Sequence, residues 1–381
     1  MSPKISIVIP IYNSASHLQH CLDSVANQTF TDIQVICVDR SSTDGSRNIL
    51  EEYAAKDPRF QIVECEDTPG GGPGQTRNAG FPYVCGKYTY FVDSDDWIDP
   101  TLCEKAYYRL EQTQCDLVLF FRSEVCEPAM QHRLQNPLED YQWSFASSEP
   151  SRYFGFQVMP WLRMIRTSFL QKINFRFPEA MISEDTFFHW VLLAHEPKTE
   201  LIPETLYHHY LRSASITGQR GEYVARLSYV FGLIKEYYLL HDKYEKFREP
   251  FLCGKMNAFV WSHKTVKKPY RELAIRCFTE TLDDDELQFL RESPLINSKV
   301  RKKILALIGR KTFRSRLCEM IRVCFNTAYR PIKMLSRKLL AILMRKQIVM
   351  FQNRIQELNG QIAARDKKIV VMQTQDNIPE R

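Results

Sequence analysis

The chain has 381 residues, a formal net charge of +6 and a hydrophobic fraction of 44%, enough for one large domain with an appendage or for two domains. No stretch reaches the roughly 18 to 20 apolar residues of a membrane-spanning helix, and the strand-like start MSPKISIVIPIYN lacks the layout of a secretory signal. Eleven cysteines without a CxxC pair indicate reduced thiols in a cytoplasmic protein.

The charge is divided unevenly along the chain. Residues 1–298 carry a net charge of −9, whereas residues 299–346 carry fifteen Lys and Arg against one acid, Glu319. An acidic front joined to a basic segment indicates two separate roles.

The first 121 residues alternate between strand and helix patterns. Apolar, β-branched runs predict buried strands at KISIVIPIY (4–12), IQVICVD (33–39), FQIVEC (60–65), YTYFV (88–92) and DLVLFF (116–121). The helices between them are expected to begin at Ser16, at Asp44, within QTRNAGFPYV (75–84) and at Asp99. This order predicts an α/β fold, Rossmann-like, with a mostly parallel central sheet and helices on both faces.

Four polar motifs follow the predicted strands. They are YNS (12–14), DRSSTDGS (39–46), PGGGPGQTRN (69–78) and DSDD (93–96). Ligands bind at the carboxyl ends of the strands in such sheets, so the four motifs together predict a nucleotide site.

The rest of the chain reads as largely helical. Residues 155–220 carry an expected helix (WLRMIRTSFLQK, 161–172), an SED motif (183–185) and a strand (TLYHHYLR, 205–212). We expect four parts, which are a catalytic domain at 1–220, a helical extension at 221–298, a basic amphipathic segment at 299–346 and a coiled-coil tail at 347–381. The tail is predicted from apolar residues at alternating spacings of three and four.

The DSDD motif collects like charges at the end of a buried strand. A divalent cation would neutralise them, because hard cations prefer oxygen ligands. Asp93 and Asp95, nearest the strand end, are favoured for a functional role. The plainer expectation is that Asp99 caps a helix and that Asp96 is solvated.

These motifs, in this order, resemble a family-2 glycosyltransferase of the GT-A fold. The resemblance covers about residues 3–220 and runs through SIVIPIYNSASHLQHCLDSVANQTF, VDRSSTDGS, GPGQTRNAG, GKYTYFVDSDDWIDP, RFPEAMISEDTFF and YHHYLRSASIT. It implies an inverting enzyme that uses a nucleotide-sugar and Mg²⁺ or Mn²⁺, of the kind that assembles bacterial surface polysaccharides or glycolipids.

The resemblance also implies roles for single residues on the donor side. Pro10 and Tyr12 would lie against the nucleotide base, Asp39 would approach the base, and Arg77 would lie near the base or the phosphates. Arg212, in a segment expected to close over the donor, would contact the diphosphate.

Metal binding and catalysis are assigned by the same resemblance. Asp95 would be the principal metal ligand, and Asp93 would lie near the ribose and the metal. Asp185 would be the general base that deprotonates the acceptor, supported by Glu184, although Asp185 could also cap the helix that follows. His208 and His209 could ligate a metal, but packing or acceptor contacts are the more common roles of such residues.

One position departs from the family pattern. The family usually has Asp-Asp-Gly-Ser after the second strand, and here Arg40 stands in place of the second Asp. That Asp typically accepts a hydrogen bond from uracil, whereas an arginine only donates. Asp39 could take over, Arg40 could turn outward, the base could differ from uracil, or the site could be degenerate.

The C-terminal segments suggest where the protein acts. Basic and apolar residues in 299–346 suit a helix at an anionic membrane surface, on the inner face of the cell membrane and close to saccharide or lipid-linked acceptors. A solvated helical subdomain is the alternative, and nucleic-acid binding is not expected because no base-reading module precedes the segment. The tail would make a homo-oligomer, or would fold back on the body. The competing function is a non-catalytic scaffold that binds a nucleotide-sugar and acts through its tail.

Overall fold

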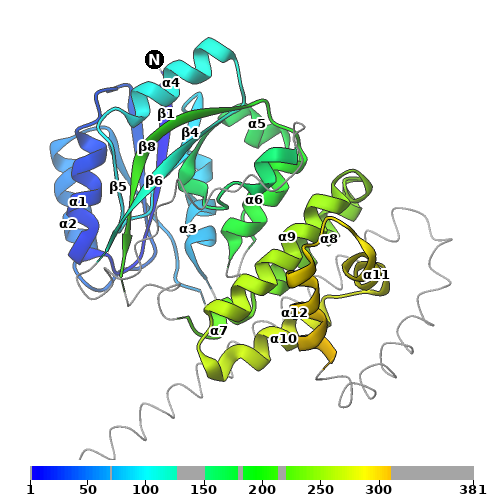
Figure 1. The fold of residues 1–381 in the computed structure, drawn as a ribbon. Helices are drawn as coiled ribbons and strands as arrows, with labels where there is room; N and C mark the ends of the chain where they lie inside the picture. The colour runs from blue at the N-terminus through cyan, green and yellow to red at the C-terminus, as the bar shows by residue number, and fades with distance from the viewer. Residues whose placement is uncertain (1, 69–70, 127–150, 179–182, 213–219, 310–381) are drawn as a thin grey trace, which may run out of the picture.

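The computed structural model describes residues 2–68, 71–126, 151–178, 183–212 and 220–309 (Figure 1). The strands are β1 (Ile5–Ile11), β2 (Ile33–Asp39), β3 (Phe60–Glu64), β4 (Tyr88–Phe91), β5 (Trp97–Ile98), β6 (Leu117–Cys126), β7 (Arg163–Arg166) and β8 (Thr199–Leu211). The α-helices are α1 (Ala15–Ala26), α2 (Ser46–Lys56), α3 (Pro73–Gly80), α4 (Leu102–Thr113), α5 (Thr167–Lys172), α6 (Glu184–Ala194), α7 (Glu222–Ala225), α8 (Leu227–Leu240), α9 (Tyr244–Thr265), α10 (Arg271–Glu280), α11 (Asp284–Glu292) and α12 (Ser298–Gly309). Short 3₁₀ helices are η1 (Phe81–Tyr83), η3 (Ser151–Gly155), η4 (Pro160–Leu162) and η5 (Lys268–Tyr270).

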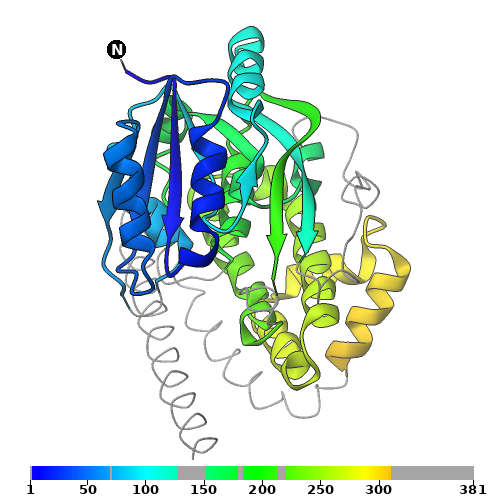
Figure 2. The same cartoon turned by 90° about the vertical axis from the view of Figure 1, so that its left-hand side faces the viewer.

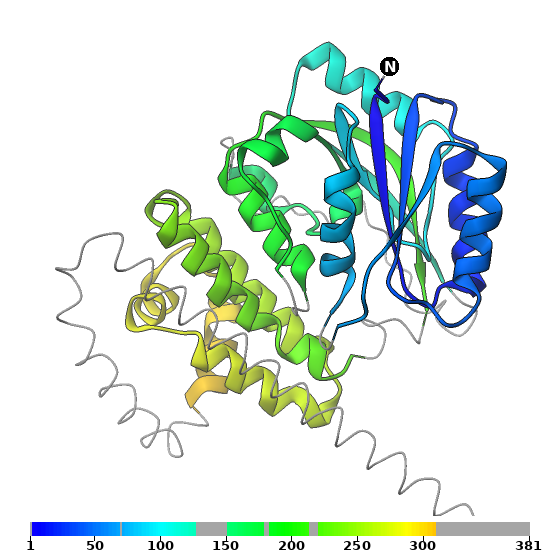
Figure 3. The same ribbon diagram turned by 180° about the vertical axis from the view of Figure 1, so that it is seen from behind.

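The strands form one sheet in the order β3-β2-β1-β4-β7-β6-β8-β5. The pairs β1–β2, β1–β4, β2–β3 and β6–β8 are parallel, which confirms the Rossmann-like half, whereas β7 runs antiparallel to both β4 and β6. The sheet as a whole is therefore mixed. Helices α1 and α2 lie on one face, and α3 and α6 lie on the other (Figures 1 and 3).

The registers of the parallel strands bring the polar motifs to one edge. Ile11 pairs with Asp39, and Asp39 pairs with Glu64, so Tyr12 and Arg40 follow neighbouring strand ends. Strands β1 and β8 both point toward the end of the sheet where the helical extension lies (Figure 2). The carboxyl edge therefore faces the extension.

The expected helix at 161–172 is wrong in its first half. Residues Arg163–Arg166 form strand β7, and only Thr167–Lys172 are helical. The side chains of Arg163, Met164 and Ile165 are each 0% exposed, and the strand fills the place between β4 and β6. Sheet pairing overrides the local pattern because the sequence of this segment gives no sign of its two neighbours.

Two helix starts also differ from the sequence expectation. Helix α1 follows Ser14 rather than Ser16, and α2 follows Gly45, whose φ of 93° favours glycine. Asp44 still helps α2 to begin, because its Oδ1 accepts a hydrogen bond from the backbone N–H of Ser46 at 3.1 Å. The same motif joins both helices, since the backbone N–H of Ser14 donates to Ser46 Oγ at 2.9 Å.

The helical extension packs directly on the sheet domain. Its helices α8 and α9 lie beside α6 (Figure 3), and the Tyr238 hydroxyl donates to the carbonyl oxygen of Trp190 at 2.8 Å. A Cβ on Gly254 would lie 2.2 Å from the Trp190 ring, so α9 reaches α6 only because residue 254 has no side chain. Extension and sheet domain share one apolar core.

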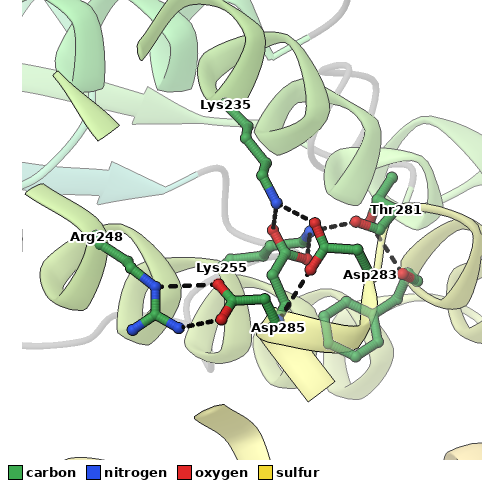
Figure 4. A network of polar contacts seen from close by, with 8 residues as sticks. Lys235, Arg248, Lys255, Thr281, Asp283 and Asp285 are labelled. Carbon is green, nitrogen blue, oxygen red and sulfur yellow. Dashed lines mark hydrogen bonds and ion pairs between the residues drawn. The ribbon is translucent and has the colours of Figure 1, made fainter. Parts of the chain in front are cut away.

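A buried ionic network joins α8, α9 and α11 (Figure 4). Glu286, 0% exposed, lies 2.6 Å from Lys255 Nζ and 2.9 Å from Lys235 Nζ. Lys235 also pairs with Asp283, and Asp283 Oδ1 caps α11 by accepting from the Glu286 backbone N–H at 2.9 Å. The partners satisfy charges that burial would otherwise penalise.

Helix α12 includes the first turns of the basic segment. Ile304 is 0% exposed, and Val300, Leu305, Leu307 and Ile308 pack against the core. The apolar face of residues 298–309 is therefore covered by the extension, as the alternative of a packed helical subdomain expects. The rest of the basic segment and the coiled-coil tail lie outside the described residues.

Candidate active site

One arginine connects the two acidic motifs. Arg77, on α3 and 2% exposed, lies with Nη2 2.5 Å from Asp93 Oδ1 and with Nη1 3.0 Å from Glu184 Oε1. Asp93 follows β4, and Glu184 opens α6. The DSDD and SED motifs were expected to share a site, and the Arg77 guanidinium indeed contacts one carboxylate of each motif.

Close packing of α3 makes this contact possible. A Cβ on Gly74 would lie 2.8 Å from Glu184 Cγ and 3.1 Å from Phe177 Cβ, so glycine is required for this approach. One turn later, Asn78 Nδ2 donates to the Phe177 carbonyl at 2.8 Å, and the Phe177 backbone N–H donates to Asn78 Oδ1 at 2.9 Å. These contacts fix α3 against the segment that leads to SED.

The SED motif forms the start of α6. Ser183 is the residue before the helix and has a φ of 69°, an uncommon conformation for a non-glycine residue. Glu184 is 5% exposed, and burial raises its pKa to about 7, against the attraction of Arg77 and with the help of the Asp185 charge. Burial likewise raises the pKa of Asp185. A carboxylate with a raised pKa is better matched to proton transfer near neutral pH.

Asp185 lies in the first helical turn rather than at the cap. Its Oδ1 accepts a hydrogen bond from the backbone N–H of Thr186 at 2.7 Å. The expectation that Asp185 could cap the helix is therefore wrong in detail, because Ser183 occupies the cap position.

The DSDD turn follows β4, and its four residues have different surroundings. Asp93 has 29% of its side chain exposed, and its pKa is raised mainly by burial and further by Asp95, against the attraction of Arg77. Ser94 Oγ lies 2.7 Å from Ser14 Oγ, which joins the turn to the start of α1. Asp95 is paired with Arg212, whose Nη2 lies 2.5 Å and whose Nε lies 3.0 Å from Asp95 Oδ2.

The expectation that Asp96 is solvated is wrong. Asp96 is 2% exposed, and it accepts hydrogen bonds at 2.7 Å from the Tyr207 hydroxyl and from the Tyr210 backbone N–H. It anchors β8, the strand that leads to Arg212. Asp99 does not cap α4 itself, since Thr101 holds that position and its backbone N–H donates to Asp99 Oδ1 at 2.8 Å.

The carboxylates suit a hard divalent cation. Asp93 and Asp95 offer oxygen ligands and repel each other, and Mg²⁺ typically takes only one or two protein carboxylates besides substrate phosphates. In the described part of the chain no group of three or more His, Cys, Asp and Glu residues is arranged to hold a metal.

The two histidines of β8 have different surroundings. His208 stacks on Trp97 and its Nδ1 lies 2.7 Å from Ser123 Oγ. Among the residues that the structure describes, His209 Nδ1 is buried and has no hydrogen-bond partner. Burial lowers the His209 pKa to about 4. His208 is therefore a packing residue, whereas His209 keeps a neutral, unpaired nitrogen.

The residues expected at the base lie at the ends of β1 and β2. Pro10 is buried within β1, and Tyr12 beyond it is 44% exposed. Asp39 is buried, and its Oδ1 accepts from the Ser42 backbone N–H at 3.2 Å. An open hollow beside this edge is lined by Asp39, Ser41, Arg47 and Glu64.

Arg40 lies against Tyr12 instead of turning outward. It is 8% exposed, and its Cζ lies 4.1 Å from the centroid of the Tyr12 ring. Asp67 contacts both, with Oδ1 3.5 Å from Arg40 Nε and Oδ2 accepting from the Tyr12 hydroxyl at 3.3 Å. Within the part of the chain that the structure describes, Arg40 Nη1 is buried and has no hydrogen-bond partner.

The sequence reasoning missed three aromatic residues at this site. Tyr207 stacks on Trp161 at 4.1 Å between ring centroids, and its hydroxyl accepts from the Asp93 backbone N–H at 3.2 Å. The Trp161 side chain also lies close enough to Asp93 to oppose the rise in the pKa of this carboxyl group. Tyr223, on α7, accepts from the Ser183 backbone N–H at 3.2 Å. A signal existed only for Tyr207, in the aromatic strand TLYHHYLR.

Comparison with known proteins agrees with this arrangement. Residues 6–171 match the model of glycosyl transferase family 2. The chain is 30% identical over 220 residues to EpsH of Bacillus subtilis (strain 168), described as a glycosyltransferase, which covers 56% of this chain and 63% of EpsH. The chain thus spans a little under two thirds of EpsH. It is 29% identical over 234 residues to the glycosyltransferase GlyG of Streptococcus pneumoniae serotype 4, which covers 57% of this chain and 73% of GlyG.

A solved structure shows the same fold. The crystal structure of S. aureus TarS 1–349 in complex with UDP-GlcNAc superposes with a TM-score of 0.60 at 22% identity, over 80% of this chain and 89% of that one. The superposition covers the helical extension in part as well as the sheet domain, since the sheet domain alone is shorter than the matched share. Among the described residues, no helix combines the length and the apolar character needed to cross a membrane.

Proposed function

We propose that this chain, whose residues 6–171 belong to glycosyl transferase family 2 and whose fold is GT-A, is an inverting glycosyltransferase. It moves a sugar from a nucleotide-sugar donor to a hydroxyl of a saccharide or lipid-linked acceptor. The observation that carries the proposal is the Arg77 junction, because it places the Asp185 turn beside the DSDD turn. The nucleotide-sugar donor and the general base, Asp185, would then meet in one site.

Asp185 acts as the general base in this proposal. Its carboxylate takes the proton of the acceptor hydroxyl while that oxygen forms a bond to the anomeric carbon and the bond to the diphosphate breaks. Glu184 and Arg77 hold the helix start in place. A single displacement, without a nucleophile from the protein, inverts the anomeric centre.

The donor lies along the strand ends. Tyr12 has an exposed ring that suits stacking on a base. Pro10, Asp39 and Arg77 are buried, so in this proposal they support that side of the site. Arg212 approaches the diphosphate, since it already lies at the DSDD turn.

Asp95 and Asp93 would hold a Mg²⁺ or Mn²⁺ ion. When bound, such an ion neutralises charge on the diphosphate leaving group. Arg212 contacts Asp95 through Nε and Nη2, so Arg212 and the metal ion would together balance the negative charge of the carboxylates and the diphosphate.

The cellular role follows from the relatives and from the basic segment. The family resemblance favours the synthesis of a bacterial surface glycan. Residues 310–346 hold eleven Lys and Arg against one acid, and we propose that they keep the enzyme on the anionic inner face of the membrane. The terminal heptads would join copies of the chain into a homo-oligomer.

The test compares catalysis in two variants. Purified chain is given UDP-, GDP- and dTDP-sugars with Mg²⁺ or Mn²⁺ and a panel of saccharide acceptors, and nucleoside diphosphate release and sugar transfer are measured. Asp185→Asn should lower the rate by about 10²- to 10⁴-fold, the usual effect of removing a general base. Asp95→Asn removes a carboxylate ligand, so it should lower the rate and raise the Mg²⁺ or Mn²⁺ concentration needed for half-maximal activity. Asp284→Asn, an exposed carboxylate on α11, is the matched control and should keep full activity.

The same experiment separates the enzyme from a scaffold. A scaffold would bind a donor, and thereby raise the melting temperature by mass action, without turnover in the wild type or in the variants. Equal rates in wild type and Asp185→Asn would refute the assigned base.

A further inference from the structure

The helical extension contributes one hydroxyl to the turn that carries the base. Tyr223, the second residue of α7, accepts a hydrogen bond from the backbone N–H of Ser183 at 3.2 Å. Ser183 directly precedes Glu184 and Asp185. The contact therefore links the extension, which follows the sheet domain in the chain, to the first turn of α6.

Ser183 needs a partner at this position. A non-glycine residue with a φ of 69° costs on the order of 1 kcal/mol and persists only where the surroundings hold it. The N–H of a residue at a helix start has no partner within the helix, and Ser183 is 8% exposed. Its carbonyl oxygen accepts from the Thr186 N–H at 3.1 Å, so the conformation of Ser183 decides how α6 begins.

Tyr223 is itself held firmly. Its ring packs on a small apolar cluster formed by Val224, Ala225, Val266 and Ala274, which is separate from the main core. The backbone of α7 is fixed as well, because Ser262 Oγ donates to the Val224 carbonyl at 2.5 Å and the Lys267 N–H donates to the Arg220 carbonyl at 3.0 Å. The hydroxyl therefore meets Ser183 as a fixed acceptor.

Electrostatics support the same placement. Burial and the charges of Glu184 and Asp185 raise the Tyr223 pKa well above its ordinary value. The phenol thus stays neutral around neutral pH, and can keep accepting from Ser183 while the carboxylates change their protonation.

We propose that Tyr223 is a positioning residue for Asp185, acting through the Ser183 peptide, and that the helical extension is thereby part of the active site. The proposal rests on the function proposed above, in which Asp185 is the base. This role gives a reason for the packing of the short helix α7, which has only four residues, against the separate apolar cluster that holds Tyr223.

The test uses two tyrosines that contact the same helix. Tyr223→Phe keeps the ring and removes the hydroxyl at the start of α6. Tyr238→Phe removes a buried hydroxyl that donates to the Trp190 carbonyl, farther along α6. We measure hydrogen exchange of the amides of residues 183–187, and kcat and donor KM with the UDP-, GDP- or dTDP-sugar that wild type turns over.

Tyr223→Phe should speed exchange of the 183–187 amides about tenfold, and should lower kcat at least tenfold with donor KM within twofold of wild type. Tyr238→Phe should leave both within twofold, even where the melting temperature falls equally. Unchanged exchange in Tyr223→Phe, or kcat losses that are equal in the two variants, would overturn the positioning role. If wild type turns over no donor, the proposed function fails, while the exchange measurement still decides whether Tyr223 fixes the turn.

Discussion

Arg40 brings a buried cation to the place where the base is proposed to lie. Its guanidinium lies 4.1 Å from the Tyr12 ring centroid, and its Nη1 has no hydrogen-bond partner among the described residues. An arginine can only donate, and in uracil the donor N3–H stands between the two acceptors O2 and O4, whereas guanine offers the adjacent acceptors O6 and N7, which suit a bidentate guanidinium contact. Although Asp67 Oδ1 lies 3.5 Å from Arg40 Nε, we propose that the other N–H groups of this guanidinium favour a guanine base over uracil.

We expect GDP to raise the melting temperature of wild type more than UDP does. Arg40→Asp replaces the donors by an acceptor and should reverse this order, with a change in relative affinity of about tenfold or more, since one good base contact is worth about 1 to 3 kcal/mol. Arg109→Asp, on the exposed side of α4, changes the charge equally and should leave the order as it is. A wild type that prefers UDP would contradict this account of Arg40.

Glu184, Asp185 and Asp93 share one nearby cation, Arg77. Burial raises the pKa of Glu184 from 4.5 to about 7 and raises those of the other two carboxyl groups. Because burial raises the pKa of Asp185 above its ordinary value, and because this base must be ionised to act, we expect activity to fall on the acid side of neutral pH. Glu184→Gln removes one negative charge beside Asp185, so the acid limb of the kcat/KM profile should move to lower pH.

The same shift affects stability in a defined direction. A carboxyl group whose folded-state pKa exceeds its unfolded value binds its proton more tightly in the folded state. Its contribution to stability is complete below pH 4.5 and is lost as the pH rises to about 7. Wild type should therefore lose melting temperature relative to Glu184→Gln over this window, and a constant difference would contradict the raised pKa.

At the scale of single residues, the sequence predicted which residues belong to the site better than it predicted which residues contact them. Asp93, Asp95, Glu184 and Asp185 were singled out by their motifs, and the structure brings those motifs together. The sequence did not predict that Arg77 joins them, because its partners come from β4 and α6 and no local pattern encodes that contact. Asp96 was misread for the same reason, since Tyr207 and Tyr210 come from a distant strand.

Among the elements, α3 depends most on one residue. Alanine is normally favoured over glycine in a helix by about 1 kcal/mol. At residue 74 the added Cβ would lie 2.8 Å from Glu184 Cγ, so α3 would have to move away from α6 and carry Arg77 with it. Gly74→Ala should therefore lower the melting temperature and reduce kcat at least tenfold.

Gly232 provides the matched control for α3. It lies inside α8, and a Cβ there would meet no atom within 4 Å. Gly232→Ala should raise stability by about 0.5 to 1 kcal/mol and leave kcat unchanged. Equal effects of the two alanines would show that Gly74 is not needed for the approach of α3.

The elements themselves were predicted unevenly. The strands of the parallel half were found from apolar runs, because a strand buried on both faces needs no partner-specific pattern. Strand β7 was read as helix, since its four residues owe their conformation to β4 and β6 on either side. The sequence therefore predicted the element type correctly where burial alone decides it. The prediction failed where the order of strands in the sheet decides it.

On the scale of the whole molecule, α12 divides the basic segment into two parts. The apolar face of residues 298–309 is buried, with Ile304 at 0% exposure, so these residues cannot present that face to a membrane while they pack on α9 and α10. The proposed membrane contact therefore rests on residues 310–346, whose net charge is +10. A chain that ends at Gly309 keeps α12 and the core it completes.

We expect the full chain to sediment with vesicles that contain anionic phosphatidylglycerol, and to sediment much less with vesicles of phosphatidylcholine alone. Each Lys or Arg near an anionic surface contributes about 1 kcal/mol, and salt screens the attraction. The chain ending at Gly309 should stay in the supernatant with both vesicle types while keeping its melting temperature and its turnover of a free saccharide acceptor. Since both chains carry α12, equal sedimentation of the two chains would place the membrane contact on residues 1–309. If the full chain still sedimented at high salt, the membrane contact would be apolar rather than electrostatic.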